Sequence, residues 1–346
     1  MSTGSPGKPR RQRTTFVIKD GIMTHFAPPG PLGFGGAPLG NMFDVVDEET
    51  AAAALTAAWD SGVRYFDTAP HYGSGLSEHR FGNVLRRYER DDFVLSTKVG
   101  RMLRPDPSCP DNGPFVHGLP FRVESDYSYD AVMRSIEDSY QRLGLAQIDV
   151  AFVHDLAADQ LGDAWEEQFE VARTGAFRAL TTLRDQGVIK GWGLGVNLTE
   201  PCVRALEQAD PDVFLLAGRY SLLNQPALDR LFPMCAERGV NVVVGGPYNS
   251  GLLAGGRTFE YSEASPEMVA KRDRIAAICA RHGADIRSAA LQFCAAHPVV
   301  AAIIPGAKRP EKVLENARLM TATVPAAVWQ ELKHERLIPA DAPTPG

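Results

Sequence analysis

The sequence predicts an α/β fold, a (β/α)8 TIM barrel with an N-terminal β-hairpin and an extra C-terminal helix. Three observations support this prediction. Short apolar runs alternate with segments of helical periodicity along most of the chain. The 346 residues suffice for one such barrel, and no change in composition marks a domain boundary. Polar residues follow several of the apolar runs, which is where a barrel carries its chemistry.

The predicted strands are the apolar runs that polar or glycine-containing segments bound. They span residues 31–37, 63–67, 93–98, 148–153, 189–196, 213–216, 240–244 and 299–304. Helices are expected between them, with Asp47 and Ser128 at N-cap positions and Gly144 just past the end of the helix that Ser128 begins. The segment from Val99 to Tyr127 is too long for an ordinary connection, which predicts a functional loop or lid.

A doubly wound sheet is the competing arrangement for alternating strands and helices. Such a sheet usually carries a GxGxxG turn after its first strand. The stretch from Gly33 to Pro38 lacks the third glycine of that motif and has a proline where the helix would begin. We therefore favour the barrel.

The expected domain organisation is simple. Residues 1–14 are expected to form a disordered leader, residues 15–338 the barrel domain and residues 339–346 a flexible tail. Within the domain, residues 15–26 are predicted to form the N-terminal hairpin around an Asp20-Gly21 turn.

Composition restricts the class of protein. The net charge of −6 gives no electrostatic reason to expect nucleic acid or an anionic membrane as a partner. No apolar run approaches the roughly 20 residues of a membrane span, and the basic N-terminus lacks the apolar core of a signal peptide. The cysteines are scattered without a CxxC pair, which is typical of a reducing cytoplasm. They are Cys109, Cys202, Cys235, Cys279 and Cys294. We expect a cytoplasmic protein.

Polar residues end four consecutive predicted strands. Asp67 ends the second strand, with Tyr72 in the loop beyond it, and Lys98, His154 and Asn197 end the third, fourth and fifth. Each residue alone has an ordinary structural explanation, such as a helix cap, an exposed lysine or a hydrogen-bonded histidine. Their occurrence at consecutive strand ends instead indicates a shared site.

The chemistry of these groups is coherent. The phenol of Tyr72 has an ordinary pKa of about 10, which a nearby ammonium such as that of Lys98 would lower. Asp67 can pair with Lys98, and His154 can hydrogen-bond a substrate oxygen. The set suits proton transfer to or from a carbonyl or hydroxyl oxygen. Reduction of a carbonyl also needs a hydride, which a cofactor must supply.

These residues belong to a series of motifs in a characteristic order. The motifs are FDTAPHYGSG, LSTKVG, AFVHD, GLGVN, RYSLLN, GGPYNSGLL and IIPGAKRPEKVLEN, which lie between residues 31 and 317. Together they resemble the aldo-keto reductase family. The resemblance implies a (β/α)8 barrel that binds NADPH or NADH in extended form. It also implies a catalytic tetrad of Asp67, Tyr72, Lys98 and His154, with Tyr72 as general acid/base and Lys98 as the partner that lowers its pKa.

The resemblance also assigns cofactor contacts. Asn197 is expected to hold the nicotinamide carboxamide, the loop 246–252 to wrap the pyrophosphate through backbone N–H groups, and Glu315 and Asn316 to reach the adenine. The full set of expected cofactor residues is Gly35, Gly36, Asp67, Asn197, Gly246, Tyr248, Ser250, Gly251, Leu252, Gly306, Ala307, Lys308, Lys312, Glu315 and Asn316.

Three features depart from the pattern of many family members. Ala217 stands in place of a glutamine, and Gly245 or its neighbour stands in place of a tyrosine that stacks on the nicotinamide. Gly306-Ala307 replaces a Lys-Ser pair, and Lys312 replaces an arginine. Lys312 or Lys308 is expected to contact a 2′-phosphate if one is present, but a lysine lacks the arginine fork. Either NADP or NAD therefore fits the sequence.

The combination of AGRYSLLN with GGPYNSGLL is most similar to the branch that contains D-threo-aldose 1-dehydrogenases and pyridoxal 4-dehydrogenases. The resemblance implies an NAD(P)-dependent oxidoreductase that acts on a small-molecule substrate, a sugar hemiacetal or a carbonyl/alcohol. A general aldehyde/ketone reductase and a pyridoxal 4-dehydrogenase are the alternatives. Expected substrate contacts are Tyr72, His154, Trp165, Arg219 and Tyr248.

Two other classes fit less well. A metal-dependent barrel hydrolase could use His71, His79, His154 and Asp155, but the first strand lacks an HxH motif. No metal is therefore expected. A cofactor-binding barrel without activity is disfavoured because all four members of the implied tetrad are present. The oligomeric state cannot be read from the sequence.

Overall fold

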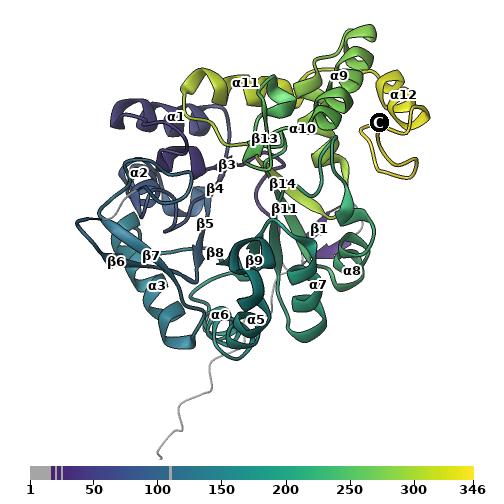
Figure 1. Ribbon diagram of the computed structural model, residues 1–346. Coiled ribbons are helices and arrows are strands. Elements are labelled where there is room, and N and C mark those ends of the chain that lie inside the picture. Colours follow the sequence, from purple (N-terminus) through teal and green to yellow (C-terminus); the bar gives the residue numbers. More distant parts are fainter. Residues whose placement is uncertain (1–16, 20–21, 25, 109–110) are drawn as a thin grey trace, which may run out of the picture.

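The structure is a computed structural model that describes residues 17–346 with the exception of 20–21, 25 and 109–110. Its main feature is a sheet of eight parallel strands in the order β14-β11-β10-β9-β8-β5-β4-β3. The two ends of this sheet meet, because Gly33 N donates to Ile303 O at 2.8 Å and Ile303 N donates to Pro31 O at 2.9 Å. The sheet is therefore a barrel, and helices surround it (Figure 1). The predicted (β/α)8 fold is confirmed.

Each barrel strand lies within or next to a predicted run. The strands are β3 (Phe34–Gly35), β4 (Tyr65–Asp67), β5 (Val94–Val99), β8 (Val150–His154), β9 (Gly191–Val196), β10 (Val213–Ala217), β11 (Asn241–Gly245) and β14 (Val300–Ile304). Three antiparallel hairpins add to the barrel. They are β1 (Val17–Lys19) with β2 (Ile22–Thr24), β6 (Arg101–Pro105) with β7 (Phe121–Ser125), and β12 (Thr258–Phe259) with β13 (Ser262–Glu263).

Helices follow the strands as the alternating pattern predicts. The α-helices are α1 (Glu48–Asp60), α2 (Leu76–Leu85), α3 (Tyr129–Leu143), α4 (Ala158–Leu161), α5 (Trp165–Thr174), α6 (Ala176–Asp185), α7 (Thr199–Gln208), α8 (Leu231–Arg238), α9 (Pro266–Arg281), α10 (Ile286–Ala296), α11 (Pro310–Thr321) and α12 (Ala326–His334). Short 3-10 helices are η1 (Ala37–Gly40), η2 (Arg90–Asp92), η3 (Gly162–Ala164), η4 (Pro226–Leu228) and η5 (Leu252–Ala254).

The predicted helix ends are confirmed at three positions. The Asp47 side chain accepts a hydrogen bond from Thr50 N at 2.7 Å, which satisfies a free donor at the start of α1. Ser128 accepts likewise from Ala131 N at the start of α3. Gly144 ends α3 in the left-handed conformation (φ 61°), which costs a glycine little.

Alternation along the strands separates the barrel core from the site. Tyr65, Phe152 and Leu215 belong to a buried apolar cluster inside the barrel. Side chains two residues apart share one face of a strand, so the next inward position after Tyr65 is Asp67 and the next after Phe152 is His154. The apolar layer inside the barrel thus lies directly beneath the polar residues at the strand ends.

The opposite, N-terminal end of the barrel is covered. Phe26 is buried in the same inner cluster, and its carbonyl accepts a hydrogen bond from Asn241 Nδ2 at the first residue of β11. Strands β1 and β2 confirm the predicted hairpin, while its Asp20-Gly21 turn and the predicted leader lie outside the described residues. The limits of the domain and of the tail 339–346 stay predictions, and Ala342 in that tail is buried.

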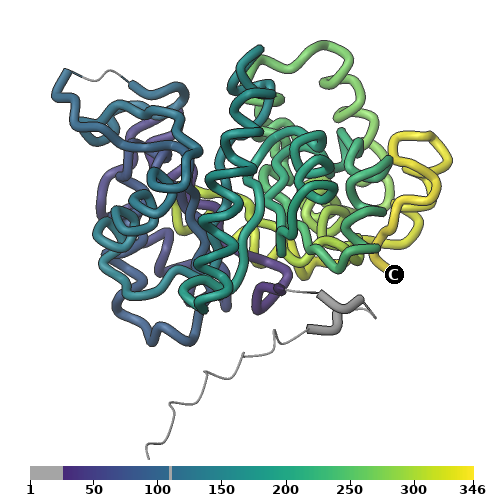
Figure 2. Tube along the Cα trace, turned by 90° about the horizontal axis from the view of Figure 1, so that it is seen from below, coloured from purple at the N-terminus to yellow at the C-terminus, as the bar shows by residue number. Residues whose placement is uncertain are grey.

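The long segment between residues 99 and 127 contains the β6–β7 hairpin, in which Arg101 pairs with Ser125 and Pro105 with Phe121. This hairpin and the segment around residue 260 rise on the same side of the molecule (Figure 2). Among the described residues, no helix combines the length and the apolar character that crossing a membrane requires.

Candidate active site

A buried ion pair lies at the centre of the site. Lys98 Nζ donates to Asp67 Oδ2 at 2.7 Å and to the carbonyl of Thr68 at 3.0 Å, and both side chains are almost fully buried. The second oxygen of Asp67 accepts from Ser96 Oγ at 2.7 Å, and Ser96 in turn lies 3.0 Å from the Tyr65 hydroxyl. Every hydrogen-bonding atom of the pair therefore has a fixed partner, which makes this buried charge tolerable.

Tyr72 lies beside this pair. Lys98 Nζ is 4.6 Å from the centroid of the Tyr72 ring, and the His154 ring lies edge-on at a centroid distance of 5.7 Å. The loop that carries Tyr72 packs tightly, since a Cβ on Gly40 would come within 2.5 Å of the Tyr72 carbonyl carbon. The structure therefore brings together the four residues that the sequence predicted: Asp67, Tyr72, Lys98 and His154.

Phe115 and His71 extend this cluster. His71 lies edge-on to Phe115 and to His154 at centroid distances of 5.2 and 5.8 Å. The Nδ1 atoms of His71 and His154 are buried and have no hydrogen-bond partner among the described residues. Such groups can accept or donate a hydrogen bond once a substrate oxygen is present.

Burial dominates the proton affinities of the site. It raises the pKa of Tyr72 well above its ordinary value, with smaller contributions from Asp67, Tyr261 and Asp155. It also raises the pKa of Asp67 against the opposing effect of Lys98, and lowers the pKa of His154 well below its ordinary value. Lys98 is expected to lower the pKa of Tyr72, but it does not offset the effect of burial on the phenol. Tyr72 is therefore protonated at neutral pH, and His154 is neutral.

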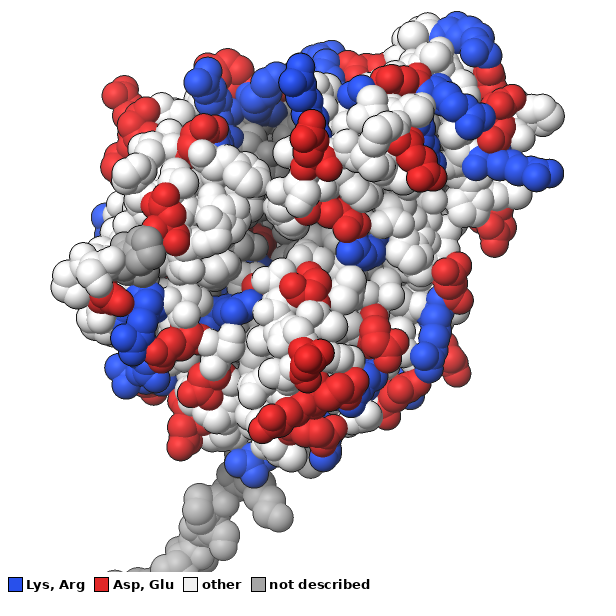
Figure 3. Space-filling view, viewed as in Figure 1, with Lys and Arg blue, Asp and Glu red and all other residues white. Residues whose placement is uncertain are grey.

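A cavity of about 640 Å³ leads away from this cluster. Asp67 and Tyr72 line one end, and Lys308, Lys312 and Asn316 line the other. Figure 3 shows the hollow at the centre of the C-terminal face, with Lys and Arg side chains along one edge. Of the predicted cofactor residues, all except Asn197 and Leu252 line the cavity.

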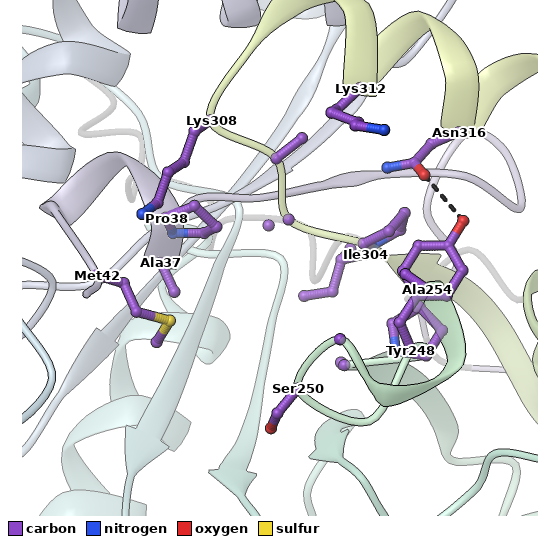
Figure 4. Close-up of a pocket in the computed structure, with 18 of the residues that line it drawn as sticks. Ala37, Pro38, Met42, Tyr248, Ser250, Ala254, Ile304, Lys308, Lys312 and Asn316 are labelled. Carbon is purple, nitrogen blue, oxygen red and sulfur yellow. Dashed lines mark hydrogen bonds between the residues drawn. The ribbon is translucent and has the colours of Figure 1, made fainter. Parts of the chain in front are cut away.

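Two loops and a helix form the cavity walls. Pro38 and Met42 lie across the cavity from Tyr248 and Ala254, as Figure 4 shows. The Tyr248 hydroxyl donates to Asn316 Oδ1 at 2.9 Å and so joins the loop after β11 to α11. The lining residues extend from Tyr72 to Lys312 and Asn316, and this spread fits an extended dinucleotide.

The loop after β11 has an unusual backbone. Gly246, Asn249, Ser250 and Gly251 all have positive φ values, between 48° and 99°. A Cβ on Gly246 would have no neighbour closer than 3.9 Å, so its backbone is open to the cavity. The Asn249 amide is buried without a hydrogen-bond partner among the described residues. Small residues and exposed backbone of this kind fit an anionic pyrophosphate.

Cations and carboxylates alternate at the far end of the cavity. Lys308 pairs with Asp44 at 2.9 Å, and Lys312 pairs with Glu315 at 2.8 Å. Glu315 is also bound by Arg287 from α10 at 2.6 Å. The end that the sequence assigns to adenosine therefore has cations whose charge is already partly neutralised.

Some predicted residues lie elsewhere. Asn197 follows β9 and donates from Nδ2 to Asp159 at 3.1 Å, while Leu252 is fully buried in η5. Trp165 packs edge-on against Phe169 at the start of α5 and is absent from the cavity lining. Arg219 is bound to Glu260.

Several residues of the cavity were not predicted from the sequence. Met42 and Phe43 come from the loop after β3, Arg287 from α10 and Tyr261 from the β12–β13 hairpin. None of them stands at a strand end or in a recognisable motif, so no local signal in the sequence marks them.

His79, one of the residues considered for a metal site, is exposed on α2. Within the part of the chain that the structure describes, no group of three or more His, Cys, Asp or Glu side chains could hold a metal ion.

Comparison with known proteins shows the family of this chain. The model of the aldo/keto reductase family matches residues 31–335. The chain belongs to the aldo-keto reductase family. Aldo-keto reductases are oxidoreductases that act on CH–OH and carbonyl groups with nicotinamide cofactors, and this chain is an enzyme of that kind.

Individual aldo-keto reductases and related dehydrogenases are similar over most of their length. Pyridoxal 4-dehydrogenase of Microbacterium luteolum is 42% identical over 322 residues, covering 89% of this chain and 94% of that protein. D-threo-aldose 1-dehydrogenase of a Pseudomonas species is 40% identical over 319 residues, with the same coverage. The holo form of an aldo-keto reductase from Bacillus halodurans has a TM-score of 0.70 at 26% identity, covering 91% of this chain and 96% of that chain.

Proposed function

We propose that this aldo-keto reductase oxidises the C1 hydroxyl of a sugar hemiacetal to a lactone, as an NAD(P)-dependent aldose 1-dehydrogenase. The observation that carries the proposal is the contact of Tyr72 with the buried Lys98–Asp67 pair at one end of the cavity. The 40% identity with a D-threo-aldose 1-dehydrogenase supports this substrate class.

Each residue of the site would have a separate role in the transfer of the proton and the hydride. A nicotinamide cofactor, when bound, would supply the hydride chemistry, as acceptor in oxidation and donor in reduction. Tyr72 Oη accepts the proton of the substrate hydroxyl in oxidation and returns it to the carbonyl oxygen in reduction. Lys98 stabilises the phenolate of Tyr72, and Asp67 holds Lys98 in place. Neutral His154 donates a hydrogen bond to the reacting oxygen and so orients the substrate.

The cavity residues would hold the cofactor. The backbone of the loop 246–251 would bind the pyrophosphate, and Glu315 and Asn316 would contact the adenine; all of these residues line the cavity except Asn249, which is buried. Lys308 and Lys312 are available for a 2′-phosphate but already have carboxylate partners. We therefore expect both NAD⁺ and NADP⁺ to serve, with dissociation constants within about tenfold of each other.

A second candidate is pyridoxal 4-dehydrogenase, which the 42% identity with the Microbacterium luteolum protein favours. Pyridoxal also presents a cyclic hemiacetal, so the same proton transfer would serve. A general aldehyde/ketone reductase would use the same groups in the opposite direction. The substrate panel described next separates these alternatives.

The experiment is an initial-rate comparison of L-fucose, D-arabinose and pyridoxal with NAD⁺ and NADP⁺, and of simple aldehydes with the reduced forms. Oxidation of the aldoses with a kcat/KM well above that for pyridoxal supports the proposal. Oxidation of pyridoxal alone selects the second candidate. Turnover of simple aldehydes without oxidation of either substrate contradicts both dehydrogenase functions.

The cellular setting also belongs to the proposal. We expect the enzyme to work in a reducing cytoplasm on small molecules, without nucleic acid or membrane partners. Cys202, Cys235, Cys279 and Cys294 are buried free thiols, and burial raises the pKa of each, which keeps them unreactive.

A further inference from the structure

The hairpin of β12 and β13 has an unfavourable turn. Thr258 pairs with Glu263 and Phe259 with Ser262, which leaves Glu260 and Tyr261 as a two-residue turn. Their φ values are 49° and 65°. Two-residue turns with positive φ at both positions strongly favour Asn-Gly, because a bulky side chain is strained in this conformation. A tyrosine at this position is therefore unexpected on structural grounds, and such strain is concentrated at functional sites.

Contacts on both sides hold the turn in place. Tyr261 N donates to Ser250 Oγ at 3.0 Å, and Thr258 Oγ1 donates to the Ser250 carbonyl at 2.5 Å. The Glu260 carboxylate is bound by the guanidinium of Arg219, which follows β10. The turn is thus fastened to the loop that lines the cavity and to the end of a barrel strand.

These contacts place Tyr261 in the lining of the cavity. Tyr261 and Tyr72 line the same cavity, and Tyr261 is one of the groups whose charge affects the pKa of Tyr72. The side chain is nevertheless 48% exposed, which is unusual for a large aromatic residue that packs against its own protein. It therefore offers a ring and a hydroxyl to whatever occupies the mouth of the cavity.

We infer that Tyr261 is a specificity-determining residue that lies over the substrate and hydrogen-bonds a hydroxyl group distant from the reacting carbon. The inference rests on the proposed function and names the feature of the substrate that is recognised, a polyhydroxylated ring. A tyrosine suits such a ring, since its apolar face covers C–H groups while its hydroxyl reaches a polar substituent. The backbone of Tyr261 is bound to Ser250, which borders the cofactor part of the cavity, and Tyr261 lines the same cavity as Tyr72, where the substrate reacts.

The test compares Tyr261→Phe, which removes the hydroxyl, with Tyr261→Gly, which also removes the ring and suits the turn. Tyr88→Phe is the matched control, because Tyr88 stacks on Trp59 and does not line the cavity. KM is measured for L-fucose in oxidation and for acetaldehyde, which has no distal hydroxyl, in reduction. Cofactor affinity is followed by the quenching of protein fluorescence, and Tm by thermal unfolding.

We expect Tyr261→Phe to raise the KM for L-fucose by about tenfold, the effect of one lost hydrogen bond, and Tyr261→Gly to raise it further. The KM for acetaldehyde, the cofactor affinity and the values of Tyr88→Phe should stay at wild-type level, and the Tm of Tyr261→Gly should not fall. A purely structural tyrosine would instead lower Tm with an unchanged KM.

Two results would overturn the inference. One is an unchanged KM for L-fucose in Tyr261→Gly. The other is weaker cofactor binding without a change in that KM, which would assign the hairpin to the cofactor. A wild-type enzyme that oxidises no aldose contradicts the proposed function itself, and the inference then falls with it. The wild-type assay thus distinguishes this failure before any variant is compared.

Discussion

The two ends of the cavity are built differently. At the proton-transfer end, Asp67 and Lys98 stand on neighbouring barrel strands, and each is about 1% exposed. At the cofactor end, the side chains of Lys312 and Asp44 are 66% and 80% exposed and come from helices and loops. The first end is fixed by a buried hydrogen-bonded pair, and the second by surface pairs that water screens.

This difference indicates how each end tolerates change. Removing one partner of a buried ion pair leaves an uncompensated charge, which is strongly destabilising, whereas exposed pairs contribute little. We therefore expect the proton-transfer end to determine stability and turnover together. The cofactor end should be adjustable with little effect on folding. The following predictions test this contrast, beginning with the largest expected effect.

Replacement of Tyr72 by Phe should reduce kcat about 10³-fold, because no other group in the cluster can exchange the proton at that position. Cofactor affinity should be unchanged within about twofold, since the ring remains. Tyr220→Phe is the control, because Tyr220 is fully buried, its hydroxyl has no partner among the described residues, and it does not line the cavity. Steady-state rates and fluorescence titration provide both measurements, and retained turnover in Tyr72→Phe would refute the assigned role.

Replacement of Lys98 by Met should lower the free energy of unfolding by about 3–5 kcal/mol and abolish turnover, because Asp67 then lacks its cation. The double variant Asp67→Asn/Lys98→Met should regain most of this stability and stay inactive. Urea unfolding and rate assays on the three proteins provide the comparison. Equal stability of the single and double variants would show that the pair is not energetically coupled.

Stability should fall in acid because of the histidines near the site. Burial, then Arg101 and Lys98, lower the pKa of His71 from 6.5 to about 4. The unfolded chain therefore binds a proton that the folded chain does not, so this contribution is complete above pH 6.5 and is lost as the pH falls toward 4. The loss should be about 1.4 kcal/mol per pH unit for His71.

The variant His71→Gln tests this assignment. Its unfolding free energy should decline less steeply than that of the wild type between pH 6.5 and 4.5, as measured by urea unfolding at several pH values. Parallel decline of the two proteins would exclude His71 as the titrating group. His297, whose pKa burial also lowers to about 4, lies outside the cavity lining and should contribute equally in both proteins.

The raised pKa of Tyr72 predicts a pH dependence of the reaction itself. Oxidation needs the phenolate and should accelerate as the pH rises from 7 toward 10, whereas reduction needs the phenol, which stays protonated over this range, and should change little. Rates at saturating cofactor and substrate measure this. A flat oxidation profile would mean that proton transfer to Tyr72 does not limit turnover.

The smallest effect is expected at the cofactor end. Lys312→Ala should weaken NADP⁺ binding by about two- to fivefold and leave NAD⁺ binding and Tm nearly unchanged, because the lysine is exposed and already paired. Fluorescence titration with both cofactors measures the difference. A comparable loss of affinity for NAD⁺ would place Lys312 against a part of the molecule that the two cofactors share.

The sequence by itself determined the order of the barrel strands and the polar residues at their ends. Alternating apolar periodicity is a local property, and so are the caps at Asp47 and Ser128, which hydrogen-bond backbone groups three residues away. The positions of Asp67, Lys98 and His154 followed from the same reasoning, because all parallel strands end on one face of a barrel. Most of the cofactor residues that the family motifs indicated line the cavity.

Only the tertiary structure decided how these groups affect one another. The pKa of Tyr72 rises although Lys98 lies beside it, because the folded chain buries the phenol. Phe43, Arg287 and Tyr261 enter the cavity from segments far apart in the chain, where no local pattern marks them. Which side chains share a cavity depends on the closure of the barrel and on the long-range contacts of its loops, and local propensity carries no information about either.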